Sequence, residues 1–415
     1  MYRVSPHLDR LALSLLAGAT LATLAVNLRP DLYYDLIETR LLPDSPFLPL
    51  LTPQVLITQG LMALFLFVLG KEFFESLRLE GGLLAAPAAR RLLAPTLAGA
   101  LLLPLALWTV TGQMGFSDLP GIEGWSLCLG ADLALAWTFG RRLFGQDHPA
   151  LPLLLFLAVA LDMIAAGGIA LERLTAALLA LLPSPEVYDS ANRLAGAVKL
   201  LWLLPAALAP LIYRATWGHH AVQDSQRQHR RSEALTPILI TALITWGSVL
   251  MAGLPAALAL LPMIPMIPHA PRSLGLFAEA EALLHDPLNR LESLILPALP
   301  VVVFLFGLTA GGIDFGALGP DTARTLGALA LRPVGLVAGA VLAIGLLGAS
   351  LPQGMRGRDL ILVALLLTPG LTLPLLALDQ GLGGGGAASG ARAGLAMSLL
   401  FGPLALSLGR LWRHR

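Results

Sequence analysis

Residues 155–170 read LFLAVALDMIAAGGIA, a run in which one aspartate, Asp162, stands among apolar and small side chains. The apolar stretch extends back to Ala150, so it reaches the roughly 20 residues that an α-helix needs to cross a bilayer. A charge at the bilayer centre costs at least about 2.5–3.5 kcal/mol, so such residues normally face a cavity or a partner. The stretch therefore predicts a transmembrane helix with a polar neighbour.

The composition of the whole chain also favours a membrane protein. Of its 415 residues, 56% are hydrophobic and 13% are charged, and the mean hydropathy is +0.76. A soluble domain is about one quarter charged, so this chain lacks the charges to cover a water-exposed exterior. We interpret it as an all-α polytopic membrane protein surrounded by lipid. The net charge of +1 and the lack of a basic stripe with aromatic residues exclude a strongly basic nucleic-acid-binding protein.

Windows of about 19 residues predict about twelve transmembrane helices. We place them near 10–28, 53–70, 91–111, 125–143, 150–171, 194–213, 234–250, 252–268, 293–311, 322–347, 359–378 and 392–411. The segment 252–268 carries four prolines, which interrupt helical hydrogen bonding. Leu11–Leu28 is long enough to span and is not followed by a cleavage site, so we expect this helix to stay in the mature protein.

The basic residues are unevenly divided between the two sets of helix connections. One set, which includes both chain ends, holds 19 Lys and Arg residues, whereas the alternate set holds Arg29, Arg40, Arg173, Arg193, Arg324 and Arg392. Cytoplasmic loops carry the excess of Lys and Arg in membrane proteins. The sequence therefore predicts that both termini lie in the cytoplasm and that the number of membrane crossings is even. Glu72, Glu75, Glu279 and Glu281 are expected on the cytoplasmic side as solvated helix ends.

Residues 1–415 are predicted to form a single transmembrane domain. The polar segment 217–233 (WGHHAVQDSQRQHRRSE) divides six predicted helices from six, and we interpret it as a central cytoplasmic linker. Gly383–Gly386 is expected to be a flexible outer loop. The single cysteine, Cys128, excludes an internal disulfide and a cysteine-based metal cluster.

Three ionisable residues lie well inside predicted helices. Asp132 stands in LCLGADLALAW, Asp162 in the fifth helix, and Arg332 in LGALALRPVGLVAGA. Lys199 lies near enough to a helix end to reach the interface. Two carboxylates and one guanidinium leave a net negative charge, which suits a cation or proton site; a structural ion pair between helices is the alternative.

Two of the predicted helices carry breaking residues near their middles. Gly130 precedes Asp132 in the fourth, and TPGLTLP (Thr368–Pro374) places Pro369 and Gly370 in the eleventh. Paired interrupted helices in the two halves of a chain are typical of a transporter ion site between inverted repeats. Ordinary proline kinks are the alternative interpretation.

These segments together resemble the NhaA family of bacterial sodium/proton antiporters. The clearest match is QGLMALFLFVLGKE (Gln59–Glu72), which resembles the family's second helix. Further similar stretches follow in the same order at Glu123–Ala136, Leu157–Ile169, Val249–Leu258, Ser293–Phe315, Leu331–Gly335 and Thr368–Leu376. The resemblance implies twelve helices with an inverted repeat, and crossed, interrupted fourth and eleventh helices.

The fifth helix departs from the family pattern. The family carries two adjacent aspartates that hold the transported ion or proton, whereas this chain reads Leu161–Asp162–Met163. Only one carboxylate remains. Methionine offers a soft thioether, a poor ligand for sodium, whereas hard cations prefer oxygen.

Other positions differ from the family as well. Arg332 replaces a lysine in the tenth helix, and a guanidinium does not give up its proton. Ala131 replaces a threonine, Gln59 an aspartate, and Pro255 stands where the family often has a histidine. Arg332 is predicted to pair with Asp162, with Asp132 balancing the interrupted helix ends.

Three functions are compatible with these residues. The first is exchange of protons for sodium or another small monovalent cation, with Asp162 and Asp132 as ion- and proton-binding residues and Arg332 as their charge partner. The second is a transport-incompetent structural subunit or scaffold of a membrane complex, and the third is transport of an organic anion against Arg332. No nucleotide, metalloprotease or Ser/His/Asp pattern indicates an enzyme, a cofactor or a metal. A homodimer or a larger membrane complex is compatible with the sequence.

Overall fold

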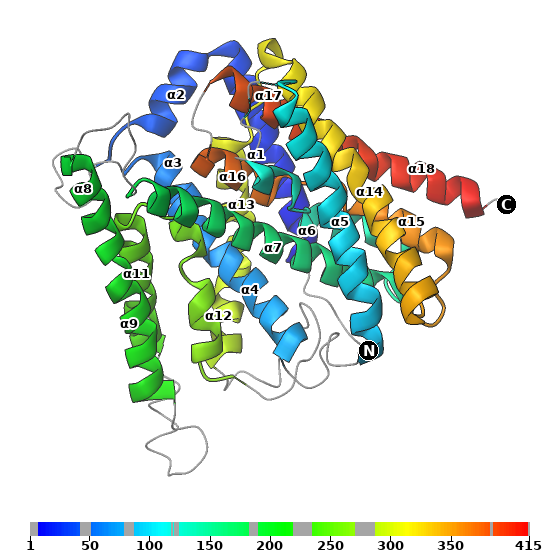
Figure 1. Ribbon diagram of the computed structural model, residues 1–415, viewed down its shortest axis with the longest axis horizontal. Coiled ribbons are helices and arrows are strands. Elements are labelled where there is room, and N and C mark those ends of the chain that lie inside the picture. Colours follow the sequence, from blue (N-terminus) through cyan, green and yellow to red (C-terminus); the bar gives the residue numbers. More distant parts are fainter. Residues whose placement is uncertain are drawn as a thin grey trace.

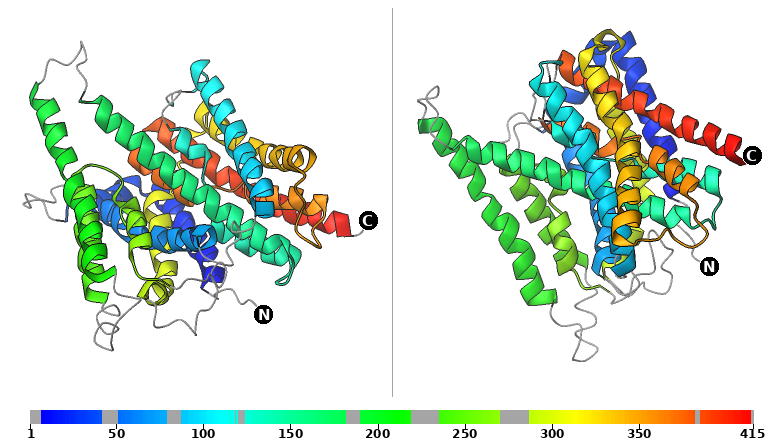
Figure 2. Two further views of the ribbon diagram at one scale, coloured as in Figure 1. Left: turned by 60° about the horizontal axis from the view of Figure 1, so that its bottom comes forward. Right: turned by 45° about the vertical axis from the view of Figure 1, so that its right-hand side comes forward.

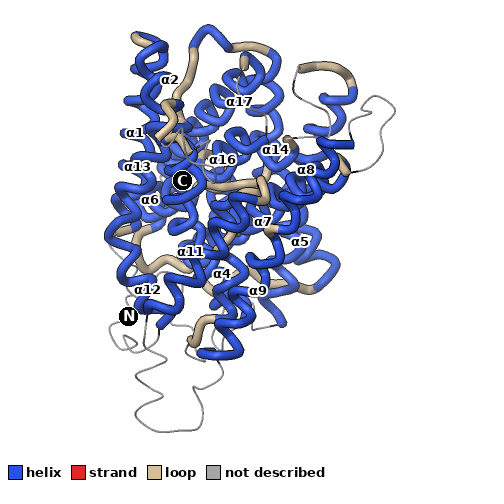
Figure 3. The backbone as a smooth tube through the Cα atoms, turned by 90° about the vertical axis from the view of Figure 1, so that its left-hand side faces the viewer, coloured by secondary structure: helices blue, strands red, loops and turns tan. Residues whose placement is uncertain are grey.

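The computed structural model describes residues 7–41, 51–78, 87–117, 119, 124–181, 190–218, 235–269, 287–381 and 385–413. Throughout these residues the regular elements are helical and none is a strand, as the tube in Figure 3 shows. The all-α class is confirmed. The predicted linker lies, from residue 219 on, outside the described residues, as do Gly383 and Gly384 of the predicted outer loop.

The helices follow one another along the chain without an intervening sheet (Figure 1). Their bounds are α1 (Leu8–Leu28), α2 (Pro30–Glu38), α3 (Pro53–Val55), α4 (Met62–Arg78), α5 (Pro87–Gln113), α6 (Leu133–Phe144), α7 (Ala150–Leu179), α8 (Ser190–Leu201), α9 (Leu203–Tyr213), α11 (Leu235–Met251), α12 (Pro287–Ile295), α13 (Leu299–Ala310), α14 (Pro320–Leu347), α15 (Gly357–Leu366), α16 (Thr372–Gly381), α17 (Gly386–Met397) and α18 (Phe401–Arg413). A π-helical turn, η1 (Leu56–Leu61), joins α3 to α4, and a 3-10 turn, η2 (Trp125–Cys128), precedes α6.

Eight continuous helical stretches in the described residues are long and apolar enough to cross a membrane. They are Leu8–Leu28, Pro53–Arg78, Ala89–Gln113, Ala150–Leu179, Gly196–Trp217, Pro287–Ala310, Pro320–Leu347 and Gly386–Trp412. The protein is therefore a polytopic helical membrane protein. Each stretch coincides with one of the segments predicted from the apolar pattern.

The predicted helix at 252–268 is not an α-helix. Two 3-10 turns, Ala256–Leu258 and Leu261–Met266, take its place after α11. Four prolines explain the difference, because each removes a backbone donor and its ring obstructs the preceding turn. The segment is nonetheless packed inside the protein, with residues 256–260 all buried.

Two further predicted helices are divided in their middles. In the first, non-helical residues 129–132 separate η2 from α6, and in the second, residues 367–371 separate α15 from α16. Both non-helical stretches are fully buried. Buried backbone outside a helix needs hydrogen-bond partners from elsewhere in the protein, and those partners define the site described below.

Glycines allow two pairs of helices to approach each other closely. Gly99 of α5 lies against the backbone of Gly335 in α14, and Gly18 of α1 lies against the backbone of Phe304 in α13. A side chain on either glycine would collide with main-chain atoms, so these pairs require residues without Cβ. Figures 1 and 2 show α5 and α14 side by side from several directions.

Helix α7 runs obliquely through the middle of the molecule, whereas α5 and α14 stand more steeply (Figures 1 and 2). Every residue from Leu153 to Asp162 is buried. The apolar run that surrounds Asp162 in the sequence is thus an interior helix. Its uniform hydrophobicity reflects burial on all sides.

Candidate ion-binding site

The two divided segments contact each other at their non-helical residues, and we call this contact the crossing. The amide of Asp132 donates to the carbonyl of Pro369 over 2.8 Å, which joins the segments through the main chain. Gly130 and Gly370 allow this approach. A Cβ on Gly130 would collide with Pro374, and one on Gly370 would collide with the carbonyl of Gly130.

Asp132 occupies the N-terminal ends of two short helices at this crossing. One carboxylate oxygen accepts from the amide of Leu135 over 3.0 Å and caps α6, and the other accepts from the hydroxyl of Thr372 over 2.7 Å at the start of α16. Because helix N-termini carry partial positive charge, a carboxylate there is stabilised. Asp132 is 1% exposed, so its charge is balanced inside the protein.

Arg332 of α14 contacts the C-terminal ends of the other halves of the two divided segments, α15 and η2. Its guanidinium donates to the carbonyl of Leu367 at the end of α15 over 2.9 Å and to the carbonyl of Cys128 at the end of η2 over 2.6 Å. A third, longer contact reaches the carbonyl of Thr368 at 3.4 Å. Since helix C-termini carry partial negative charge, the cation stabilises both ends.

Asp162 lies beside this crossing, and only one of its two carboxylate oxygens accepts a hydrogen bond from a described residue. Its Oδ1 accepts from the amide of Ala131 over 3.0 Å, while its Oδ2 is buried and has no hydrogen-bond partner in the described part of the chain. The residue is fully buried. A buried carboxylate oxygen without a partner favours either a proton or a bound cation, because the unpaired charge is expensive in a dry interior.

The geometry assigns different tasks to the three charges. Asp132 and Arg332 are held by helix ends of opposite sign, so their charges are largely compensated by the backbone. Asp162 has one backbone donor and one open oxygen. Of the three groups, it is the one whose carboxylate has an oxygen that no described residue contacts by a hydrogen bond.

Comparison with known proteins gives the family. A family model described as Na+/H+ antiporter 1 matches residues 210–407. The Na(+)/H(+) antiporter NhaA of Jannaschia sp. is 31% identical over 431 residues, covering 98% of this chain and 97% of that protein. This chain belongs to the NhaA family. The Na(+)/H(+) antiporter NhaA 2 of Pelobacter propionicus (29% identical, 99% of this chain and 98% of that protein) and the NhaA of Geobacter metallireducens (29%, 98% and 97%) are similar over the same extent.

Membership of the NhaA family confirms the resemblance predicted from the sequence. The relatives are named as antiporters and are transporters. None of these comparisons supports the alternative interpretation as a transport-incompetent scaffold.

The direct ion pair predicted between Asp162 and Arg332 is absent. Among the described residues, no carboxylate oxygen lies within 4.0 Å of an Arg332 nitrogen. The two terminal nitrogens of the guanidinium instead donate to main-chain carbonyls, while its Nε has no hydrogen-bond partner among the described residues. The sequence pattern could not reveal these partners, because every residue has a main-chain carbonyl and no residue type marks the ones that accept from Arg332.

Two hydroxyl groups of the crossing were missed by sequence reasoning. Thr372 donates to Asp132, and the hydroxyl of Ser398 accepts from the amide of Gly370 over 3.4 Å. Both side chains are buried. The position of Thr372 could have been noticed in the sequence, because it lies three residues after Pro369, where a helix begins again after the break.

Glu172 also fixes the crossing, from the far part of α7. Its carboxylate accepts from the amide of Gly124 and from the hydroxyl of Ser126, the latter over 2.7 Å. These bonds hold the start of η2 against the helix that carries Asp162. No sequence pattern indicated this role for Glu172.

A second group of buried charges lies where α4 approaches α12. Lys71 contacts Glu292 at 2.7 Å, Glu75 at 2.9 Å and Glu72 at 3.6 Å, and all four side chains are less than 10% exposed. The expectation that Glu72 and Glu75 are solvated helix ends is therefore wrong. Glu279 and Glu281 lie outside the described residues.

Of two basic residues singled out in the sequence, one differs from its predicted surroundings and the other agrees with them. Arg324, placed in a connection by the sequence, lies buried in α14, where it stacks over Trp108 at 4.0 Å and donates to the carbonyl of Leu119. Lys199 lies in the exposed last turn of α8. The apolar stem of a long basic side chain explains the first, because it lets the charge enter a helix interface when carbonyls are available.

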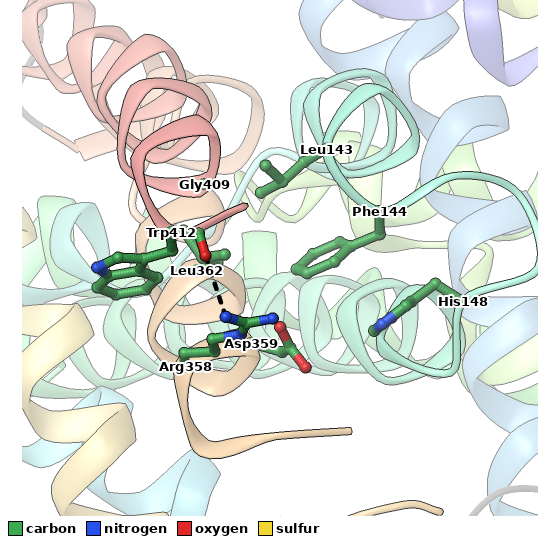
Figure 4. Close-up of a pocket in the computed structure, with 8 residues that line it drawn as sticks. All are labelled: Leu143, Phe144, His148, Arg358, Asp359, Leu362, Gly409 and Trp412. Carbon is green, nitrogen blue, oxygen red and sulfur yellow. Dashed lines mark hydrogen bonds between the residues drawn. The ribbon is translucent and has the colours of Figure 1, made fainter. Parts of the chain in front are cut away.

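A cavity of about 150 Å³ lies between the end of α6, the start of α15 and the end of α18. Figure 4 shows its lining, with Arg358 donating to the carbonyl of Trp412 and His148 stacked on Phe144. None of the predicted site residues lines it. The crossing of the divided segments, and not this cavity, is therefore the candidate ion site.

Proposed function

We propose that this protein exchanges protons for sodium ions across the bacterial inner membrane. Asp162 binds the proton and the cation in turn, Asp132 supplies fixed negative charge at the helix N-termini, and Arg332 is the fixed positive partner. The NhaA-family relatives, named Na(+)/H(+) antiporters over nearly the full chain length, support this activity. The role of Asp162 is supported by its Oδ2 at the crossing, which has no hydrogen-bond partner among the described residues.

Competition for one carboxylate would couple the two ions. A protonated Asp162 has no charge to attract sodium, and a sodium ion bound to the carboxylate prevents protonation. The loss of the second carboxylate at Met163 leaves one exchangeable group on α7. Sodium also needs neutral oxygen ligands, and we expect these to be main-chain carbonyls at the helix breaks and the hydroxyl of Thr372.

In the proposed topology the chain passes through the membrane twelve times. Eight of these passes are the continuous apolar stretches, two are the divided pairs η2–α6 and α15–α16, and two are α11 and the proline-rich segment 255–266. An even number of crossings agrees with the excess of Lys and Arg at both chain ends and in alternate connections. We propose that both termini are cytoplasmic. A homodimer or larger complex stays a prediction.

The test is cation-dependent proton flux in everted membrane vesicles between pH 6.5 and 9. Sodium, lithium and potassium are added in turn to vesicles that contain the wild type, Asp162→Asn or Asp147→Asn. Asp147 is an exposed carboxylate in the loop before α7, so its substitution controls for loss of an acidic residue. We expect sodium-driven flux in the wild type and in Asp147→Asn, and none in Asp162→Asn. Flux that survives Asp162→Asn in inserted, folded protein would refute the assignment.

A further inference from the structure

A second carboxylate lies at the other end of the helix that leaves the crossing. Asp379 stands in the last turn of α16, seven residues after Thr372, which is about 10 Å along a helix axis. The side chain of Gln54, at the start of the α3–α4 span, donates to Asp379 Oδ1. Thr58 and Arg392 are its other polar neighbours. Asp379 is mostly buried and has no part in the candidate ion-binding site around Asp162.

The buried hydroxyl of Thr58 lies beside the Asp379 carboxylate without reaching regular hydrogen-bond geometry with any described residue. The Thr58 side chain is 0% exposed. The buried hydroxyls of Thr96 and Thr241 donate to the carbonyl four residues earlier, as helical threonines commonly do. Thr58 lies in the π-helical turn η1 and makes no such bond. Its oxygen is left beside the Asp379 carboxylate.

The electrostatics of this position favour a cation. The last turn of a helix carries partial negative charge, so a carboxylate there is opposed by the helix it belongs to. Arg392 acts on Asp379 from beyond ion-pair distance, since no contact between them within 4.0 Å occurs in the described part of the chain. A small cation at the carboxylate would neutralise the side chain and offset the partial negative charge of the helix end.

We propose that Asp379 and Thr58 form a second binding site for a sodium ion. The Asp379 carboxylate and the Thr58 hydroxyl supply two oxygen ligands. Rotation of the Gln54 side-chain amide by 180° would turn its carbonyl oxygen toward the ion in place of its NH2 group and supply a third. The site rests on the proposed antiport function, in which it holds sodium on the way between Asp162 and the side of the membrane opposite the chain termini. Helix α16 connects the two carboxylates, because its first residue contacts Asp132 and its last turn carries Asp379.

Sodium binding to the purified protein tests the proposal without relying on transport. Binding is measured by calorimetry with sodium chloride against choline chloride at constant ionic strength. The Asp162→Asn protein, in which the first site is disabled, is expected to bind one sodium ion, and Asp162→Asn/Asp379→Asn to bind at least about tenfold more weakly. Asparagine keeps the shape of Asp379 and its bond to Gln54. Absence of sodium binding in Asp162→Asn, or equal binding in the double variant, would overturn the second site.

A pair of substitutions at one position isolates the hydroxyl. Thr58→Val replaces the oxygen with a methyl group of similar size, and Thr58→Ser retains it. In the Asp162→Asn background we expect sodium affinity to fall about three- to tenfold with valine and to change less than about twofold with serine. Equal affinities for the two variants would remove Thr58 from the site.

Failure of the two proposals gives different results. If the wild type shows no exchange but Asp162→Asn binds sodium through Asp379, the second site stands and the antiport function falls. If exchange is normal and Asp379→Asn changes neither sodium binding nor the KM for sodium, the second site falls and the antiport function stands. The expected result is an increase of about threefold or more in the KM of Asp379→Asn, with exchange retained at saturating sodium.

Discussion

Replacing Arg332 with methionine should destabilise the protein more than any single loss of a surface charge. Methionine is similar in length and apolar, so the change removes the donors with little change in volume. The carbonyls of Leu367 and Cys128, which end α15 and η2, then lose their guanidinium partner inside the protein.

The cost follows from those two carbonyls. Leaving a buried polar group unsatisfied costs about 1–3 kcal/mol, so the pair costs about 2–6 kcal/mol. Removal of a buried guanidinium also relieves its desolvation, which keeps the expected net loss near the middle of this range, about 4 kcal/mol. Arg332→Lys should lose about 2 kcal/mol, which is between the wild type and Arg332→Met. One ammonium group cannot donate to both helix ends as the forked guanidinium does.

The assay is reversible unfolding in mixed detergent micelles, followed by circular dichroism, for the wild type and the two variants. Arg142→Met is the control, since Arg142 is exposed in the last turn of α6 and should change the free energy of unfolding by less than about 1 kcal/mol. A stability of Arg332→Met within 1 kcal/mol of the wild type would refute the assignment of Arg332 to the helix ends.

Three further changes test other parts of the fold and site. Gly130→Ala should lower the free energy of unfolding by about 2 kcal/mol or more, because its methyl group collides at the crossing, whereas Gly167→Ala has open space and should raise it by about 0.5–1 kcal/mol; equal effects in thermal unfolding would contradict the packing. Met163→Asp restores an acidic neighbour on α7 and should lower the KM for sodium in vesicle flux assays, and an unchanged KM would show that this position does not face the ion. Asp9→Asn weakens a partly exposed contact with Arg141 at 2.6 Å, so stability should fall by less than about 1 kcal/mol; a larger loss in the same unfolding assay would show that solvent does not screen the pair.

The apolar pattern predicted most of the helices because burial in lipid and burial in protein both demand hydrophobic runs. It failed at 252–268, where the composition is apolar but four prolines prevent a continuous α-helix. It also missed α2, whose nine residues are too short and too polar to resemble a span. Hydropathy therefore locates segments in the membrane without determining the backbone conformation inside it.

The residues of the site were predictable by type but not by partner. Asp132, Asp162 and Arg332 stood out because charges inside apolar helices are costly. Their contacts depend on carbonyls and amides at the helix breaks, and every residue has such groups, so no sequence pattern distinguishes them. Asp379 and Thr58 escaped notice because both lie in the outer turns of spans, where polar residues are ordinary.

The length of α7 has a mechanical consequence. Its 30 residues extend about 45 Å, whereas the hydrocarbon core of a bilayer is about 30 Å thick, and the helix lies obliquely in the bundle (Figure 2). Asp162 is the thirteenth residue of the helix, close to its midpoint. When a rod pivots about its centre, the ends travel far and the middle hardly moves. A thicker or thinner bilayer would therefore change the tilt of α7 and the surroundings of its ends while leaving the depth of its carboxylate nearly constant.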